Sequence, residues 1–274
     1  MKSRSLIPLV LSLMALVLGA VTVVAAPQYR VAAVKPSPSS LFVIEQPAPT
    51  PSPSPTPTPT PTPVAVATPN GTLTFAVPVY RQTMNLDCET AALQMGLAAM
   101  GHSFSQDTLF KAAPYDPRLP VMGPVVNGHK TVAQWGDPYS SFVGRVDGAD
   151  LIPTGYGVYF PVIVSVAQSH GAPNSYGREG FTPAEIYATV AAGHPVVAWT
   201  ETGWGLPYVG YWTTFDGSKR IRYSLIEHAV TLSGVSATQV RVNDPWKSGS
   251  QYWVSKGQFE RSWADFNNMA VVLQ

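Results

Sequence analysis

The sequence predicts an α+β fold, because signals for helices and strands are segregated along the globular part of the chain. Apolar residues recur at helical spacing in residues 88–99, whereas residues 226–244 contain two short runs of small and β-branched residues that are typical of strands. Between them, residues 181–200 predict a capped helix followed by a strand. This order favours helices packed against an antiparallel sheet over alternating parallel βαβ units.

Residues 1–26 have the profile of a signal peptide or an N-terminal membrane anchor. Lys2 and Arg4 precede an uncharged run from Leu6 to Ala25, which is about as long as a bilayer-spanning helix. Pro27 would hinder cleavage after the small residues that end this run, so both interpretations stay open. The positive N-terminal end predicts an extracytoplasmic location for the rest of the chain, with membrane contact through this segment alone.

Residues 27–72 are predicted to form a disordered linker rich in Pro, Thr and Ser. The tract PSPSPTPTPTPTP at residues 51–63 lacks the apolar residues for a core and the backbone donors for a helix. As an extended polyproline spacer, the linker would reach on the order of 100 Å. Its composition is compatible with O-glycosylation. The remaining residues 73–274 are enough for one globular domain with a single core.

The composition excludes several classes of function. Charged residues make up 12% of the sequence and the net charge is +1, so no basic field would hold nucleic acid. The sequence contains no Walker motif, so no ATP-driven transport domain is expected. We expect a monomer without a cofactor.

Cys88 is the only cysteine, so an intramolecular disulfide is impossible. The thiol is a buried apolar group, an intermolecular partner or a nucleophile. Asp87 is expected to cap a helix that begins at Cys88 and closes at Gly101, which would place the sulfur where free helix N–H groups favour a thiolate. The carboxylates of Asp87 and Glu89 would raise the thiol pKa, so a catalytic Cys88 needs a cationic partner such as imidazolium.

The helix and strand of residues 181–200 have clear boundary signals. Thr182 and Glu185 match a capping box, and Pro183 occupies the first helical position. Gly193 ends the helix, and a strand is predicted over residues 195–200.

His228 is the candidate partner of the thiol. It lies in IEHAVTLSGV, and a second strand-like run, QVRVNDPW, follows. If the two runs form a hairpin whose turn centres on Ser236, with Gly234 opposite Thr238, His228 falls opposite Asp244 and within reach of its carboxylate. A one-residue slip would place Asn243 there instead. A surface ion pair is the competing interpretation.

The remaining histidines are expected in loops or turns. None has a metal-type spacing to another histidine or to Cys88, so no metal site is predicted. They are His102, His129, His170 and His194.

The segment VPVYRQTMNLDCETAALQMGLAAMG resembles the opening of the bacteriocin-processing (double-glycine leader) peptidases of the papain-like cysteine peptidase superfamily, where a glutamine lies six positions before the nucleophile. Gln82 and Cys88 keep this spacing. EHAVTLSGV and VNDP resemble the histidine strand and the following aspartate of the group, and GDPYSSFVG and TGYGVY resemble segments of stand-alone exported members.

The resemblance implies a papain-like fold, in which a helical subdomain carrying the cysteine packs against a twisted antiparallel sheet carrying the histidine, with the active site in the cleft between them. It also implies a catalytic set in which Cys88 attacks, His228 transfers the proton and Asp244 orients the imidazole. Gln82 would donate to the oxyanion together with the Cys88 N–H. The chain departs from the pattern at Glu89, where many members have a small residue.

Three functions stay open. The favoured one is an extracytoplasmic cysteine peptidase that acts on a peptide or protein substrate of unknown identity. A catalytically inactive papain-like module could instead bind peptide or cell-wall material through aromatic residues, although such residues more often fill a core. The aromatic residues in question are Trp199, Trp204, Tyr208, Tyr211 and Trp212. A transglutaminase-like acyl transferase would use the same triad with an amine in place of water.

Overall fold

The computed structural model describes residues 64–67, 71–205, 209–246 and 248–274, all within the compact unit Thr56–Gln274. The segment of residues 1–26, most of the predicted linker and Tyr208 lie outside the described residues. In the described ranges, no helix has the length and apolar character needed to cross a membrane.

The main sheet is antiparallel throughout, and its strands run in the order β1-β2-β11-β8-β14-β7, with β12 paired to β11 and β13 paired to β12. These strands are β1 (Val66–Ala67), β2 (Leu73–Thr74), β7 (Tyr176–Arg178), β8 (Val196–Glu201), β11 (Glu227–Val235), β12 (Gln239–Asp244), β13 (Ser250–Ser255) and β14 (Ala270–Val272). Strand β1 lies in residues predicted as linker, so the described strands begin within the last residues of that segment.

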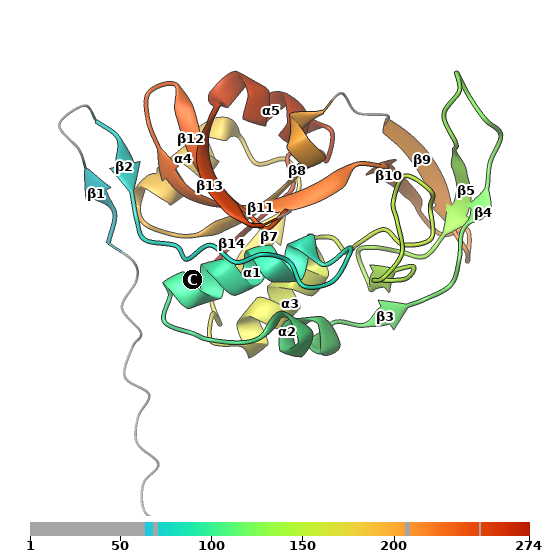
Figure 1. Cartoon of the computed structure of the whole chain (residues 1–274), viewed down its shortest axis with the longest axis horizontal. Helices are drawn as coiled ribbons and strands as arrows, with labels where there is room; N and C mark the ends of the chain where they lie inside the picture. Colours follow the sequence, from blue (N-terminus) through green and yellow to red (C-terminus); the bar gives the residue numbers. More distant parts are fainter. Residues whose placement is uncertain (1–63, 68–70, 206–208, 247) are drawn as a thin grey trace, which may run out of the picture. The chain divides into compact units, whose positions relative to one another are not determined.

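Helices cover both faces of this sheet (Figure 1). One face packs against α1 (Cys88–Ala99) and α3 (Phe160–Ser169), with α2 (Gln106–Ala112) beside α1. The other face packs against α4 (Pro183–Ala191) and α5 (Lys256–Ala264). All nine residues of β11 are therefore buried. The predicted α+β class is confirmed, with helices on two faces where the sequence analysis had placed one helical subdomain.

Local signals set the helix boundaries as expected. Helix α1 begins at Cys88, and Gly101 follows its end with a φ of 89° that favours glycine. Helix α4 begins with the predicted capping box, in which Thr182 and Glu185 bond each other's backbone N–H groups.

A smaller sheet has the order β10-β9-β5-β4. Its strands are β4 (Val121–Met122), β5 (Val132–Trp135), β9 (Val209–Thr214) and β10 (Arg220–Ser224). Strand β5 pairs in parallel with β9 and thereby joins distant segments of the chain. A short parallel pair, β3 (Tyr115–Asp116) with β6 (Phe142–Val143), and the 3₁₀ helix η1 (Thr202–Trp204) complete the described elements.

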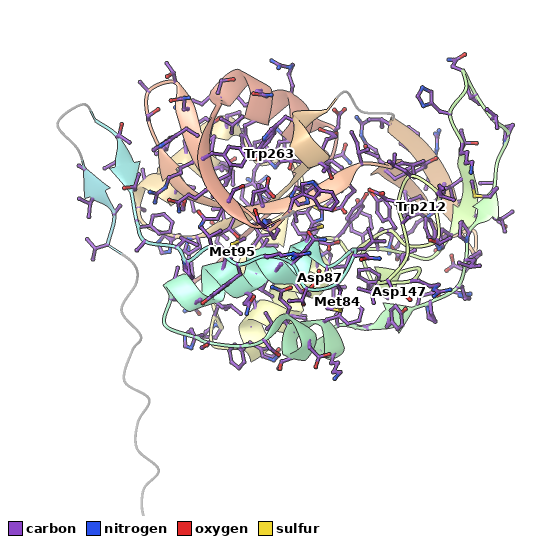
Figure 2. The ribbon with its side chains drawn as sticks, viewed as in Figure 1. Met84, Asp87, Met95, Asp147, Trp212 and Trp263 are labelled. Atoms are coloured by element: carbon purple, nitrogen blue, oxygen red, sulfur yellow. The ribbon has the colours of Figure 1, made fainter. Side chains whose placement is uncertain are left out.

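Most of the large aromatic side chains fill cores. Trp199 and Trp212 are fully buried, and their indole N–H groups donate to the carbonyls of Val158 and Gly136. Figure 2 shows Trp212 at the small sheet and Trp263 above the main sheet. Of the described aromatic residues considered for a binding surface, only Tyr211 is exposed.

Candidate active site

Cys88 is the first residue of α1, as the sequence predicts, but Asp87 does not cap the helix through its side chain. Its carboxylate instead accepts from the N–H of Met84 at 3.2 Å, because the turn before the helix presents that donor; both residues lie at the start of α1 in Figure 2. The predicted side-chain cap is therefore wrong. Burial raises the pKa of Asp87 to about 6, against the lowering effect of the backbone hydrogen bonds that it accepts.

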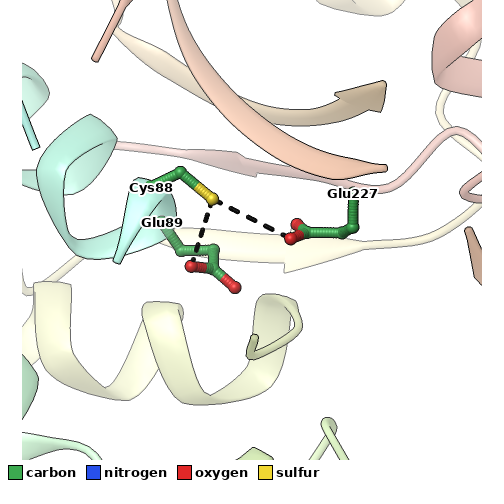
Figure 3. Close-up of side chains that lie close together, drawn as sticks. All are labelled: Cys88, Glu89 and Glu227. Atoms are coloured by element: carbon green, nitrogen blue, oxygen red, sulfur yellow. Dashed lines mark hydrogen bonds between the residues drawn. The ribbon is translucent and has the colours of Figure 1, made fainter. Parts of the chain in front are cut away.

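The sulfur of Cys88 lies between two carboxyl groups (Figure 3). It donates to Oε2 of Glu89 at 3.4 Å and approaches Oε2 of Glu227 at 3.8 Å. Burial raises the pKa of Cys88 well above its usual value, and negative charge on Glu227 and Glu89 raises it further, whereas a hydrogen bond from the Ala229 backbone lowers it. In this arrangement the thiol form is favoured, so the helix N-terminus alone does not yield a thiolate.

Both glutamates are held inside the domain. Oε1 of Glu89 accepts from the N–H of Val158 at 2.5 Å. A Cβ at Gly157 would overlap this same carboxyl oxygen, so the glycine makes room for it. Burial raises the pKa of Glu89 to about 7, and burial together with the charge of Glu89 raises the pKa of Glu227 well above its usual value.

Strand alternation explains why Glu227 reaches the sulfur. Successive side chains of a strand point to opposite faces, so Glu227 and Thr231 share the face toward α1. The Thr231 hydroxyl accordingly donates to the carbonyl of Ala92 in α1 at 2.7 Å. Glu227 was missed at the sequence level because only the fold brings it to Cys88, 139 residues away; its place directly before His228 is the signal that could have identified it.

His228 and Asp244 are hydrogen bonded, from Nε2 to Oδ1 at 2.8 Å. The predicted register is nevertheless wrong, because Gly234 pairs with Arg241 and not with Thr238. Two features shift it. The Ser236 side chain accepts from the N–H groups of Thr238 and Gln239, which moves the turn toward the C-terminus, and β11 has an irregularity between Leu232 and Gly234. Asp244 therefore reaches His228 diagonally and not from the directly opposite position.

Asp244 is well supplied with donors. Besides the imidazole, it accepts from the N–H of Trp246 at 2.8 Å and from the hydroxyl of Tyr252 at 2.7 Å. Burial alone would raise the pKa of Asp244, but these hydrogen bonds and the charge of His228 bring it below its usual value. The sequence analysis did not identify Tyr252, which lies on β13 beside β12.

Asn243, the alternative to Asp244, points to a different environment. Its side chain accepts from Ser233 at 2.7 Å and donates to the carbonyls of Val77 and Pro78 at 3.0 and 3.1 Å. It forms no hydrogen bond to His228 among the described residues, so its contacts indicate a role in bracing the chain.

The side chain of Gln82 is engaged with its own loop. Its Nε2 donates to the carbonyls of Asn85 at 2.8 Å and Met84 at 3.2 Å, and its buried Oε1 has no partner among the described residues. The Gln82 N–H donates to the carbonyl of Pro245 at 2.9 Å, which ties this loop to the segment after Asp244.

A pocket of about 470 Å³ brings these elements together. Gln82, Cys88, Glu227 and His228 all line it, and Trp246 contributes to its wall. Within the described chain, the sulfur bonds the glutamates and not the imidazole of His228. The other four histidines do not contribute to the described lining.

Cys88, Glu89 and Glu227 form the only group of possible metal ligands found in the described ranges. The sulfur of Cys88 and one carboxylate oxygen each from Glu89 and Glu227 lie within 4.8 Å of one another. Both carboxyl groups have raised pKa values, which favours protons over a cation at this position.

Comparisons with known proteins agree with the geometry. The model of the Peptidase C39-like family matches residues 74–271. A crystal structure of a Bacillus anthracis protein assigned as a C39-like peptidase superimposes with a TM-score of 0.60 and 25% sequence identity, covering 72% of this chain and 94% of that one. No curated protein sequence matches the chain with significance.

Two further solved structures are more distant, each with a TM-score of 0.41. One is a double-glycine motif protease from an AMS/PCAT transporter in complex with its leader peptide, with 15% identity over 77% of this chain and 99% of that one. The other is the peptidase domain of Streptococcus ComA, a bifunctional ABC transporter of a quorum-sensing pathway, with 13% identity over 72% of this chain and 98% of that one.

Proposed function

The chain belongs to the Peptidase C39-like family and is a cysteine peptidase-like hydrolase, as its motifs predicted; we propose that it hydrolyses peptide bonds outside the cytoplasm through Cys88, His228 and Asp244. One observation carries the proposal: Cys88 and His228 line the same pocket, and the imidazole of His228 is hydrogen bonded to Asp244. A sulfur nucleophile, a base and a group that orients the base are the parts needed for acyl transfer to a thiol.

The hydrogen bond at Nε2 of His228 leaves Nδ1 to serve the sulfur. In the proposed reaction, Nδ1 takes the proton of Cys88, and the thiolate attacks the carbonyl carbon of the peptide. The imidazolium then protonates the leaving amine, and a water molecule deprotonated by the same imidazole releases the acid product. In the structure the sulfur bonds the glutamates, and strand alternation points His228 to the face of β11 opposite Glu227, so the proposed reaction requires a rearrangement that brings the sulfur into contact with Nδ1.

The oxyanion of the tetrahedral intermediate would be stabilised by the backbone N–H of Cys88 and the amide of Gln82. Gln82 can take part if its Nε2 gives up the longer of its two hydrogen bonds, the one to the carbonyl of Met84 at 3.2 Å. The bond to Asn85 at 2.8 Å would then still hold the side chain in place.

The proposed location outside the cytoplasm rests on residues 1–26 and on the linker that follows them. We expect a peptide or protein substrate that reaches the domain at the end of the linker. Fractionation of cells that express the full chain, followed by protease treatment of intact cells, tests this location. Recovery of the intact domain in the protease-protected cytoplasmic fraction would contradict it.

The test of the activity is cleavage profiling of a peptide library with the full chain, beside Cys88→Ala as a matched control. We expect Cys88→Ala to abolish turnover and to leave the thermal midpoint within a few degrees, because the change removes only one buried atom. A residual rate close to that of the unmodified protein would exclude Cys88 as the nucleophile. A collapse of the midpoint would instead assign Cys88 to the core.

A non-catalytic peptide-binding module is the second candidate, and one observation favours it: Cys88 is only 5% exposed, and its sulfur is held by carboxyl groups. Iodoacetamide separates the two candidates, because Cys88 is the only thiol in the chain. Rapid and pH-dependent labelling of the folded protein supports catalysis, whereas labelling that requires denaturant supports the module.

A further inference from the structure

We infer that Glu89 and Glu227 form a proton-sharing pair that decides whether Cys88 can ionise, so that both glutamates act on catalysis through the sulfur as positioning residues. The inference deepens the proposed function and rests on it for the effect on turnover. The effect on the thiol itself is measurable without any substrate.

The interior around Glu89 and Glu227 cannot hold two negative charges. Glu89 and Glu227 are 1% and 6% exposed, and their carboxylate oxygens and the sulfur lie within 4.8 Å of one another. Within the described part of the chain, no lysine or arginine forms an ion pair with either glutamate. Two carboxylates this close in a buried site cannot both stay ionised, because each disfavours the charge of the other and burial disfavours both. At least one of them therefore keeps a proton.

The second step identifies the group that keeps it. The carboxyl of Glu89 accepts a backbone N–H from Val158, which stabilises its ionised form. Glu227 Oε1 is buried and has no partner among the described residues, so nothing there offsets the cost of ionising Glu227. Glu227 is accordingly the stronger holder of the proton, and its Oε2 faces the sulfur at 3.8 Å.

The third step relates the proton count of the pair to the state of the sulfur. When both carboxyl groups are protonated, their O–H groups can donate to a thiolate, and the proton of Cys88 would pass to Nδ1 of His228 once the sulfur contacts it, as the proposed function requires. When the pair loses a proton, an ionised carboxylate accepts from the thiol and repels a thiolate. Loss of one proton from the pair thus returns Cys88 to its unreactive form.

Other titratable groups face this cluster from each element packed around it. Asp87 lies on the α1 side, Glu201 on β8 opposite Glu227, and Asp150 in the pocket wall. Tyr156 and Tyr159 lie close enough to Glu227 to interact with its charge, and burial keeps their pKa values well above the usual range, so they stay neutral. The acids all act in one direction, since their negative charge favours retention of the proton by the pair. The nearest base along the chain is His228, which follows Glu227 on β11 and points to the other face of the strand.

The inference predicts an unusual pH profile for the unmodified protein. The alkylation rate of Cys88 should be highest at mildly acidic pH, where the pair is neutral, and should fall as the pH rises through about 7, where Glu89 ionises. An ordinary thiol shows the opposite trend, because its thiolate fraction only rises with pH.

The experiment measures the iodoacetamide labelling rate of the full chain from pH 4.5 to 9, together with thiolate absorbance in the ultraviolet. Glu89→Gln and Glu227→Gln both keep the size of the side chain, but only Glu89→Gln removes the charge that appears near pH 7. We expect the falling limb of Glu89→Gln to move to higher pH, with labelling at pH 8 at least about tenfold faster than in the unmodified protein. Glu227→Gln leaves Glu89 to ionise and should keep a falling limb near pH 7. Glu201→Gln is the matched control, since it also removes a buried carboxyl, one that does not bond the sulfur. Its profile should shift less, and toward lower pH, because loss of the Glu201 charge lets the pair give up a proton more easily.

The inference is overturned if Glu89→Gln keeps the profile of the unmodified protein, or if Glu201→Gln shifts it as far as Glu89→Gln does. If a variant does not fold, the unmodified protein decides alone, because a labelling rate that only rises toward pH 9 contradicts the proton-sharing pair. Shifted labelling without peptide cleavage would remove the proposed function and keep this inference. Cleavage with unshifted labelling would do the reverse.

Discussion

Two walls of the same pocket bury carboxyl groups and treat them in opposite ways. The imidazole wall is His228, which lines the pocket, together with Asp244 and Tyr252, which are hydrogen bonded in series to it; the carboxylate of Asp244 accepts from three donors and its pKa lies below the usual value. The acid wall is Glu227, which lines the pocket, together with Glu89, which shares the thiol of Cys88 with it. Within the ranges described, backbone N–H groups reach Glu89 alone, and the pKa values of both glutamates are raised.

The difference shows that burial alone does not set the protonation state of a carboxyl; the hydrogen-bond donors around it also count. Asp244 is only 6% exposed, as Glu227 is. The imidazole wall has enough donors to keep a charge that orients His228, whereas the acid wall lacks them and must hold a proton. The pocket therefore places a fixed negative charge behind the base and a titratable one beside the nucleophile.

The largest expected effect breaks the imidazole wall. Asp244→Asn should reduce turnover at least ~10²-fold with substrate binding preserved, because the amide no longer fixes the tautomer of His228. Steady-state kinetics that separate kcat from KM measure this. Asn243→Ala is the control: it removes buried hydrogen bonds and should cost about 2–4 kcal/mol of stability with kcat of the folded protein kept. The reverse result, with kcat lost in Asn243→Ala and kept in Asp244→Asn, would assign the orienting role to Asn243.

The contrast between the two walls shows which features of the site could be predicted from the sequence. The His228–Asp244 contact could be predicted because the two residues lie in adjacent strands joined by a short turn. Their register could not, since it depends on the Ser236 hydrogen bonds that set the turn and on the irregularity beside Gly234. The contact survives the error because diagonal neighbours in a sheet are still within reach of long side chains.

The acid wall could not be predicted from the sequence, for a different reason. Glu89 was visible as a departure from the family pattern, but its partner Glu227 comes from a strand late in the chain, and Gly157 and Val158 from a loop between them. No local pattern links these segments. The end of α1 and both ends of α4 were predictable because capping and glycine signals act within a few residues. Helix α1 begins at the predicted residue, but the Asp87 carboxylate that was expected to cap it accepts from the nearby Met84 N–H instead.

The next largest effect is expected from Gln82, the proposed side-chain donor to the oxyanion. Gln82→Ala should reduce kcat about 10²–10³-fold if its amide stabilises the oxyanion. Because the same amide braces residues 84 and 85, the thermal midpoint must be measured beside kcat. A lower midpoint with unchanged kcat would reduce Gln82 to a loop brace.

A smaller effect, on stability, is expected when a methyl group is added beside Glu89 and no charge is changed. In Gly157→Ala, the added methyl group would overlap the carboxyl of Glu89, and relieving the overlap should cost about 1–3 kcal/mol. Thermal unfolding measures this cost. Gly217→Ala serves as a control, because its φ of 74° strains alanine but no atom lies near the added Cβ. If Gly157→Ala unfolds at the temperature of the unmodified protein, the carboxyl of Glu89 is less confined than the structure indicates.

The smallest effect is expected in the pH dependence of the thermal midpoint, to which raised and lowered carboxyl pKa values contribute with opposite sign. Burial raises the folded pKa of Asp87 to about 6 and those of Glu89 and Glu201 to about 7, so the stability that these groups contribute is fully present below about pH 4 and is lost as the pH rises toward 7. Asp244 has a lowered folded pKa, so its contribution is present at neutral pH and is lost only as the pH falls below its usual range. The thermal midpoint should therefore peak near pH 5 and fall by several degrees by pH 8, and Glu201→Gln should flatten part of that fall. A midpoint that rises steadily from pH 5 to 8 would mean that the acid wall finds donors in solution, and the contrast between the walls would then not hold.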